Sequence, residues 1–167
     1  MNEIRQVETL SEADRATLFD WGTDIFGADR FKLRWRPKDL HFLMVADGEV
    51  VSHVGILKHE VSVANRSIKV AGVGGVVTVP AAQKRGYASD LMRHAANFFS
   101  GWGIEAGLLF CMPYRIKLYE SLGWQLLSDA VFLEQPEGVI ESPLKVMVLP
   151  LRTQWPKGAV ALNSFPW

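Results

Sequence analysis

The sequence predicts an α+β fold in which helices pack against a mixed, mostly antiparallel central sheet. Three apolar runs between residues 41 and 79 are separated only by short turns, which is typical of a meander of antiparallel strands. The apolar positions of residues 87–102 recur with helical spacing, and residues 106–112 form the continuous apolar run of a strand buried on both faces. A chain of 167 residues has the usual size of one domain, so we expect residues 1–167 to form a single unit.

The first forty residues predict a strand, a helix and an irregular connection. Residues 3–10 alternate weakly between polar and apolar side chains, which favours a strand. Ser11, with Asp14 three positions later, is a helix-start pattern, and apolar residues with helical spacing follow it. Residues 28–40 are charged and contain Pro37, so we expect a loop or a short helix there.

Two turn signals define the meander. Asp47–Gly48 separates the apolar runs 41–46 and 49–64, and an Asp-Gly pair in this position favours the tight turn of a hairpin. Asn65–Arg66 predicts the next turn, after which residues 67–79 return as the third strand.

The second half of the chain alternates helices and strands. The predicted helix at 87–102 precedes the buried strand at 106–112, and residues 114–124 are predicted to form another helix. Two more strands are expected within 125–135 and 144–151, while the tail that follows has no clear period.

Composition argues against several classes of protein. Eighteen Lys and Arg balance eighteen Asp and Glu, so the net charge favours neither nucleic acid nor a membrane surface as a partner. Cys111 is the single cysteine, which leaves no internal disulfide and no cysteine-based metal site, and we expect no metal. No apolar run reaches the roughly 18 residues of a membrane span. We therefore expect a soluble, cytoplasmic protein.

A cationic turn stands between the third strand and the helix at 87–102. Gln83, Lys84 and Arg85 supply donors and charge, and Gly86 allows a ligand to approach the backbone closely. A helix start offers unpaired N–H groups and a partial positive charge, so a phosphate or pyrophosphate is the expected guest. The alternative is a solvated basic turn with no ligand.

Three glycines lie inside the strand that leads to this turn. Gly72, Gly74 and Gly75 do not complete a dinucleotide-binding pattern, and the turn lacks the pattern of a P-loop. Glycines inside a strand mark a bulge or the close approach of a ligand, and alternatively a bent strand in a curved sheet. The two interpretations are compatible, because a bulge that bends a strand away from its neighbour opens a cleft.

Two segments resemble the signatures of the GCN5-related N-acetyltransferase (GNAT) family. Q-K-R-G-Y-A at 83–88 is similar to the Q/R-x-x-G-x-G/A signature, and L-Y-E-S-L-G-W at 118–124 is similar to L-Y-x-x-x-G-F/W. The order of elements over residues 3–150 also fits. The resemblance implies a three-layer α/β/α arrangement and acetyl-CoA, an acylated coenzyme A, as acyl donor.

The resemblance also assigns roles to particular residues. It implies that the pantetheine arm and the acetyl carbonyl lie along Val77, Thr78 and Val79. It implies a phosphate cradle formed by Gln83, Lys84, Arg85, Gly86, Tyr87 and Ala88. Tyr119 matches the usual general acid, which protonates the departing thiolate; the alternative is a helix tyrosine packed against the sheet.

The general base is less clear from the sequence. Many family members carry a glutamate on the fourth strand, and Gly74 stands at that position. A water chain, His53 or Glu60 on another strand, or loss of activity are the remaining options. His53 is our candidate, against the alternative of a structural histidine. Cys111 is expected to be a core residue rather than a nucleophile.

The end of the sequence resembles two subgroups of the family, the aminoglycoside 2'-N-acetyltransferases and the nodulation-factor acyltransferases, in its W-P-K-G-A segment and its last residue, Trp167. We expect an N-acetyltransferase that moves acetyl from acetyl-CoA to a primary amine of a small molecule or amino sugar, by direct attack through a tetrahedral intermediate. The alternatives are a catalytically silent acyl-CoA-binding module and an acyltransferase for longer donors. A homodimer is compatible with the sequence.

Overall fold

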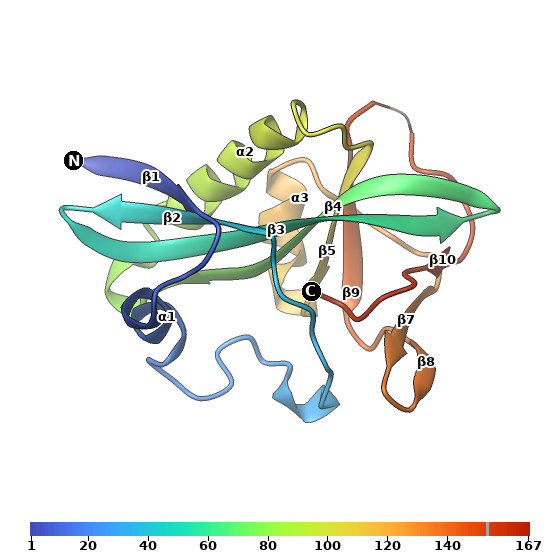
Figure 1. The fold of residues 1–167 in the computed structure, drawn as a ribbon, viewed down its shortest axis with the longest axis horizontal. Helices are drawn as coiled ribbons and strands as arrows, with labels where there is room; N and C mark the ends of the chain where they lie inside the picture. The colour runs from blue at the N-terminus through green and yellow to red at the C-terminus, as the bar shows by residue number, and fades with distance from the viewer. Residues whose placement is uncertain (153) are drawn as a thin grey trace.

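The computed structural model describes residues 1–152 and 154–167 and shows one curled sheet with helices on both faces (Figure 1). Helix α2 (Tyr87–Phe99) and the short helix α3 (Ile116–Ser121) cover one face. Helix α1 (Glu12–Phe19) packs on the opposite face, where Leu18 meets Leu43 and Val77. This arrangement confirms the predicted α+β fold with three layers.

Ten strands make up the sheet in the part of the chain that the structure describes. Their bounds are β1 (Asn2–Val7), β2 (Leu40–Ala46), β3 (Glu49–Val63), β4 (Arg66–Thr78), β5 (Ala106–Cys111), β6 (Gln125–Leu126), β7 (Val131–Gln135), β8 (Gly138–Glu141), β9 (Lys145–Pro150) and β10 (Val160–Ala161). The path runs β6-β9-β5-β4-β3-β10-β7-β8, and β2 pairs with the first half of β3 and with β1. Among the described strands, only the pairs β4–β5 and β7–β10 are parallel, so the sheet is mixed and mostly antiparallel, as predicted.

The predicted meander is present as β2, β3 and β4. Asp47 and Gly48 have φ values of 51° and 83°, which suit the tight hairpin turn expected from this pair. The second turn lies one residue earlier than predicted, because Ala64 and Asn65 rather than Arg66 take positive φ values. Within residues 1–152 and 154–167, three 3-10 turns supplement the helices: Asp29–Phe31, Pro80–Ala82 and Pro113–Arg115.

The C-terminal part of the chain departs from the prediction. The segment 125–135, predicted as one strand, contains two: β6 pairs with β9, whereas β7 pairs with β8 and β10 on the other side of the sheet. The tail, which has no clear period, adds β10 and packs Trp167 onto the sheet. Such short strands are specified by their partners, which no local pattern reveals.

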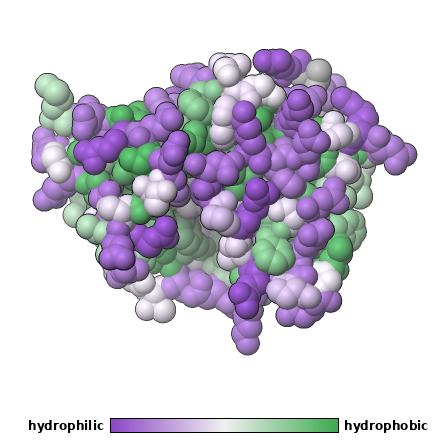
Figure 2. Space-filling model, viewed as in Figure 1, coloured by the Kyte–Doolittle hydropathy of each residue, from purple (hydrophilic) through white to green (hydrophobic). Residues whose placement is uncertain are grey.

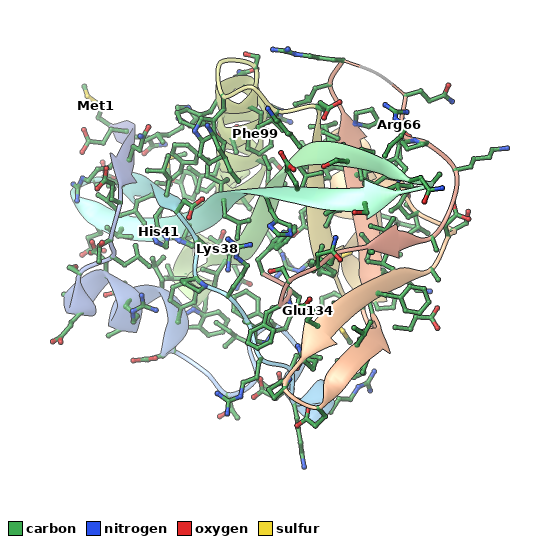
Figure 3. All side chains as sticks on the ribbon, turned by 45° about the vertical axis from the view of Figure 1, so that its right-hand side comes forward. Met1, Lys38, His41, Arg66, Phe99 and Glu134 are labelled. Atoms are coloured by element: carbon green, nitrogen blue, oxygen red, sulfur yellow. The ribbon has the colours of Figure 1, made fainter. Side chains whose placement is uncertain are left out.

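The two faces of the sheet bury separate sets of side chains. Beneath α2 and α3, the core includes Phe42, Ile56, Leu91 and Phe99, all fully buried. Figure 3 labels Phe99 on α2. On the opposite face, apolar residues of β3, β4, β5 and β9 are covered by the tail with Trp167. Within the described residues, no helix combines the length and the apolar character needed to cross a bilayer.

Candidate active site

The strands β4 and β5 separate in the middle of the sheet. They pair in parallel only from Val70–Ala106 to Val73–Leu109, although β4 continues to Thr78. At the same level the register of β3 against β4 shifts between His53 and Gly55. A bulge of this kind bends the strand, and Gly75, which lies opposite this register shift, has a φ of 63° that suits glycine.

Two adjoining cavities occupy the place where the strands separate. The larger has a volume of about 620 Å³ and is lined by Gly74, Gly75, Val76 and Tyr119 among others. The smaller, of about 450 Å³, lies beside the turn before α2. Phe26 and Arg115 line both. The face of the molecule seen in Figure 2 has a hollow. Hydrophobic residues lie at its floor, and hydrophilic residues border it.

The turn before α2 has the features of an anion site. Gly86 is the N-cap of α2 with a φ of 84°, and no side chain caps the helix, so its first N–H groups have no side-chain acceptor. Lys84 also has a left-handed backbone, with a φ of 64°, and the Gln83 side chain donates to the Thr78 carbonyl at 3.0 Å. The helix start borders the smaller cavity, since Gly86, Tyr87 and Ala88 are among its lining residues.

The predicted coenzyme residues divide into two groups. Those that line the smaller cavity are Val77, Thr78, Gln83, Lys84, Gly86, Tyr87 and Ala88. Val79 and Arg85 line neither cavity. The Val79 N–H donates to the Val51 carbonyl at 2.9 Å, so this N–H is already used within the protein.

Tyr119 lies on α3 and is buried against the larger cavity. Burial raises the pKa of its phenol to about 12, although the Arg115 charge opposes the shift. The phenol is therefore protonated throughout the neutral pH range and can donate a hydrogen bond or a proton.

His53 is buried at the bulge with both ring nitrogens occupied. Its Nδ1 lies 2.6 Å from the Gly75 carbonyl oxygen, and its Nε2 lies 2.8 Å from Nδ1 of His41. A carbonyl only accepts, so Nδ1 of His53 carries the proton and its Nε2 accepts from Nδ1–H of His41. Nε2 of His41 is then unprotonated, and His41 lines the larger cavity.

Both histidines are held neutral. Burial lowers the pKa of His53 to about 3, partly opposed by the Gly75 carbonyl. Burial also lowers the pKa of His41, with the charges of Lys38 and Arg15 adding to the shift. In the folded protein, both imidazoles are therefore uncharged at neutral pH.

These shifts predict that the fold is less stable in mild acid. Between about pH 6.5 and pH 3 the unfolded chain binds a proton at His53 that the folded chain excludes, so the free energy of unfolding falls as the pH falls through this window. We expect a loss on the order of a few kcal/mol, measured by urea unfolding at a series of pH values. His53→Gln should flatten this dependence and His94→Gln, on α2, should not; equal slopes in both variants would contradict the assignment.

A family model described as an acetyltransferase (GNAT) domain matches residues 21–127. The chain belongs to the GNAT acetyltransferase family. The predicted family is thus confirmed, and the separation of β4 from β5 in this GNAT domain lies within the matched residues. The aminoglycoside and nodulation-factor subgroups stay a prediction.

Solved GNAT structures share the fold at low identity. A GNAT acetyltransferase from Brucella melitensis in complex with acetyl-CoA is 17% identical, with a TM-score of 0.56 over 98% of this chain and 96% of that chain. The Escherichia coli GNAT protein YhbS in complex with CoA is 16% identical, with a TM-score of 0.63 over 97% and 89%. The ribosomal-protein-S18-alanine N-acetyltransferase of Escherichia coli is 18% identical, with a TM-score of 0.59 over 93% and 97%.

At Gly74 the candidate site has no carboxylate side chain, and other atoms occupy the space that such a side chain would need. A Cβ placed there would lie 2.6 Å from Cε of Lys38 and 2.8 Å from the main-chain carbonyl carbon of Trp167. Glu60 offers no substitute: it accepts from the Ser67 hydroxyl at 3.0 Å near the far end of β3 and lines neither cavity. The structure therefore gives no support to Glu60 as the base.

Some residues of the cavity agree with the sequence prediction and others were missed. Cys111 is a buried core residue, as predicted, and burial raises the pKa of its thiol to about 11, which leaves it protonated. Lys38, His41 and Arg115 were not predicted as site residues. No spacing could have indicated them, because they come from a loop, an antiparallel strand and a short turn.

Proposed function

We propose that this GNAT domain transfers the acetyl group of acetyl-CoA to the primary amine of a small molecule. The observation that carries the proposal is the pair of adjoining cavities where β4 leaves β5: the smaller is lined by Gly86 of the anion turn, the larger by Tyr119, and Phe26 and Arg115 line both. A pyrophosphate at the turn and a thioester at the bulge would lie along these cavities. The acetyl-CoA and CoA complexes of the Brucella and YhbS structures support the choice of donor.

In this proposal the main chain binds the donor. The N–H groups of Tyr87 and Ala88 at the start of α2, with the turn from Gln83 to Gly86, hold the pyrophosphate. The pantetheine arm follows Val77 and Thr78, which line the smaller cavity. The acetyl carbonyl lies against the bulge, where a strand that has left its neighbour can offer N–H groups to an oxyanion.

The reaction then needs two proton transfers. The amine nitrogen attacks the carbonyl carbon and forms a C–N bond, and the tetrahedral intermediate collapses by breaking the C–S bond. We propose that the amine proton goes to Nε2 of His41, with His53 as the residue that fixes its tautomer, and that Tyr119 donates to the thiolate. A weakly basic imidazole is sufficient, since the nitrogen of the intermediate is positively charged and far more acidic than a free ammonium.

The test of the function is thiol release from acetyl-CoA with the purified full chain and a panel of primary amines. Acceptor-dependent release, with the N-acetylated product identified by mass spectrometry, is the expected result. Tight coenzyme binding without turnover of any acceptor would instead support the silent binding module, which is favoured by the missing carboxylate at Gly74. Faster release from a longer acyl-CoA would identify a longer-chain acyltransferase.

The histidine pair predicts a specific kinetic result. His41→Phe removes the proton acceptor and His53→Phe removes the group that orients it, so both should lower kcat/KM by roughly tenfold or more. In the native enzyme, neither histidine should cause more than a small decline in kcat/KM between pH 8 and pH 7, because the pKa of each lies below its usual value of about 6.5. An unchanged kcat/KM in His41→Phe across that range would remove the pair from the mechanism.

A further inference from the structure

The larger cavity contains more positive than negative side chains. Arg15, Lys32, Lys38 and Arg115 line it, and Asp29 is the one carboxylate side chain among its described lining residues. The chain as a whole is neutral, so this excess is local. If a main-chain carboxylate of Trp167 is counted as well, the cavity still has four positive groups and two negative ones. Such a cavity repels a polycation and attracts an anion.

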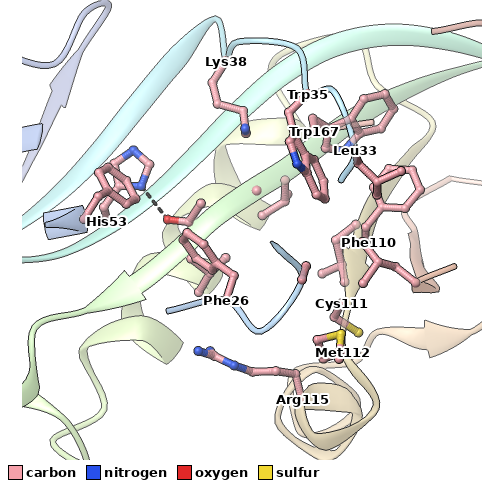
Figure 4. Close-up of a pocket in the computed structure, with 18 of the residues that line it drawn as sticks. Phe26, Leu33, Trp35, Lys38, His53, Phe110, Cys111, Met112, Arg115 and Trp167 are labelled. Carbon is pink, nitrogen blue, oxygen red and sulfur yellow. Dashed lines mark hydrogen bonds between the residues drawn. The ribbon is translucent and has the colours of Figure 1, made fainter. Parts of the chain in front are cut away.

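Lys38 is the most constrained of these cations. Gly55 and Gly74 are partners across β3 and β4, and together they form the surface on which the Lys38 side chain lies. A Cβ on Gly55 would approach Lys38 Cγ to 2.5 Å, and one on Gly74 would approach Cε to 2.6 Å. Figure 4 shows the lysine nitrogen pointing into the cavity, and Figure 3 shows Lys38 beside His41.

In the described part of the chain, Lys38 forms no ion pair with an Asp or Glu side chain, and the main-chain carbonyl of Trp167 lies beside the end of its side chain at Gly74. The ion pairs there join Met1 to Asp47, Glu3 to Arg5 and Asp90 to Arg93. Burial, with the Arg36 charge adding to it, lowers the pKa of Lys38 to about 8. Most of the ammonium is therefore still charged at pH 7, and a half-buried charge without a partner is costly.

The other walls of the cavity are apolar and largely aromatic. Phe26, Trp35, Phe110 and Trp167 surround the space between Lys38 and Arg115 (Figure 4). Trp167 is fixed in place, since its indole N–H donates to the Leu108 carbonyl at 3.0 Å. A volume of about 620 Å³ accommodates the acetylated end of a donor together with an acceptor the size of an aromatic amino acid.

We propose that the acceptor is a primary amine that also carries a carboxylate and an apolar, aromatic-sized body, with its carboxylate bound by Lys38. The inference rests on the proposed function and narrows its acceptor class. A carboxylate on the acceptor supplies an ion-pair partner for Lys38, which has none among the described Asp and Glu side chains, and the aromatic walls bury the body. A polyamine or an aminoglycoside, with several positive charges and little apolar surface, fits this cavity poorly.

The experiment compares matched ligands with the full chain in the presence of CoA. Calorimetry measures the binding of N-acetylphenylalanine and of its uncharged carboxamide, and thiol release from acetyl-CoA measures kcat/KM for phenylalanine, phenylalaninamide and spermidine. We expect the carboxylate form to be preferred over the carboxamide by about tenfold or more in both measurements. Lys38→Met should reduce this preference to near one. Lys69→Met, which removes an exposed lysine on β4 outside both cavities, should retain it.

The outcomes separate the two proposals. Equal binding and equal turnover of acid and amide, or a preference for spermidine, would overturn the acceptor class and leave the acetyltransferase function intact. Carboxylate-selective binding that depends on Lys38, without any turnover, would support the anion site and count against catalysis. An acetyl group added to Lys38 itself, seen in the mass spectrum of the protein, would identify the lysine as a nucleophile and overturn its role in binding.

Discussion

Replacing Tyr119 by phenylalanine is expected to lower kcat by about a hundredfold while the dissociation constant of CoA changes little. The substitution removes only the hydroxyl, so the ring still fills its place in the buried cluster beneath α3. The lost group is a phenol whose pKa of about 12 keeps it protonated, and its role in the proposal is to stabilise the departing thiolate. Single-turnover measurements of thiol release and calorimetry with CoA test the two halves of this prediction.

A second tyrosine provides the comparison. Tyr114 is 65% exposed and donates to the Phe26 carbonyl at 3.3 Å, so Tyr114→Phe also removes one phenol hydroxyl near the site. It should affect kcat much less than Tyr119→Phe. Equal effects of the two variants would mean that Tyr119 acts through packing, and an unchanged kcat in Tyr119→Phe at several pH values would exclude it as the acid.

Gly86→Asp is expected to weaken CoA binding on the order of a hundredfold, since losing one or two charge-assisted bonds has an effect of this size. The aspartate places a negative charge at the N-cap of α2, where the proposal puts a pyrophosphate, and its side chain can occupy the N–H groups that the phosphate needs. A Cβ at Gly86 meets no atom within 4 Å, so the effect would come from charge and backbone conformation rather than from a collision. Calorimetric titration with CoA measures it.

Gly103→Asp is the matched control for this variant. Gly103 has a φ of 74°, close to the 84° of Gly86, and a Cβ there also meets no atom within 4 Å. It follows α2 in the chain and lines neither cavity, so the same backbone strain and the same charge are introduced away from the proposed site. If both aspartate variants bind CoA equally well, the turn before α2 does not hold the pyrophosphate.

Local patterns were sufficient for the main elements of the fold. The Asp47–Gly48 turn, the helical spacing after Gly86 and the apolar run of β5 each depend on neighbours in the chain, and each was predicted correctly. The short strands β8 and β10 were not anticipated, and β6 was predicted only as part of one strand with β7. Each has two to four residues, too few for a periodic signal, and each exists because a partner strand satisfies its backbone groups.

The residues of the candidate site also fall into two groups, those that a local sequence pattern predicted and those that it did not. The sequence by itself determined the family, the cationic turn at 83–86 and the position of Tyr119, because these depend on contiguous segments with a recognisable spacing. Only the tertiary structure decided which groups surround the larger cavity. His41 meets His53 through the register of β2 against β3, and Lys38 lies over Gly55 and Gly74 because two strands bring these glycines opposite each other. Such contacts join residues far apart in the chain, and the free energy that selects them comes from burial and pairing across the whole sheet, which no single segment of sequence contains.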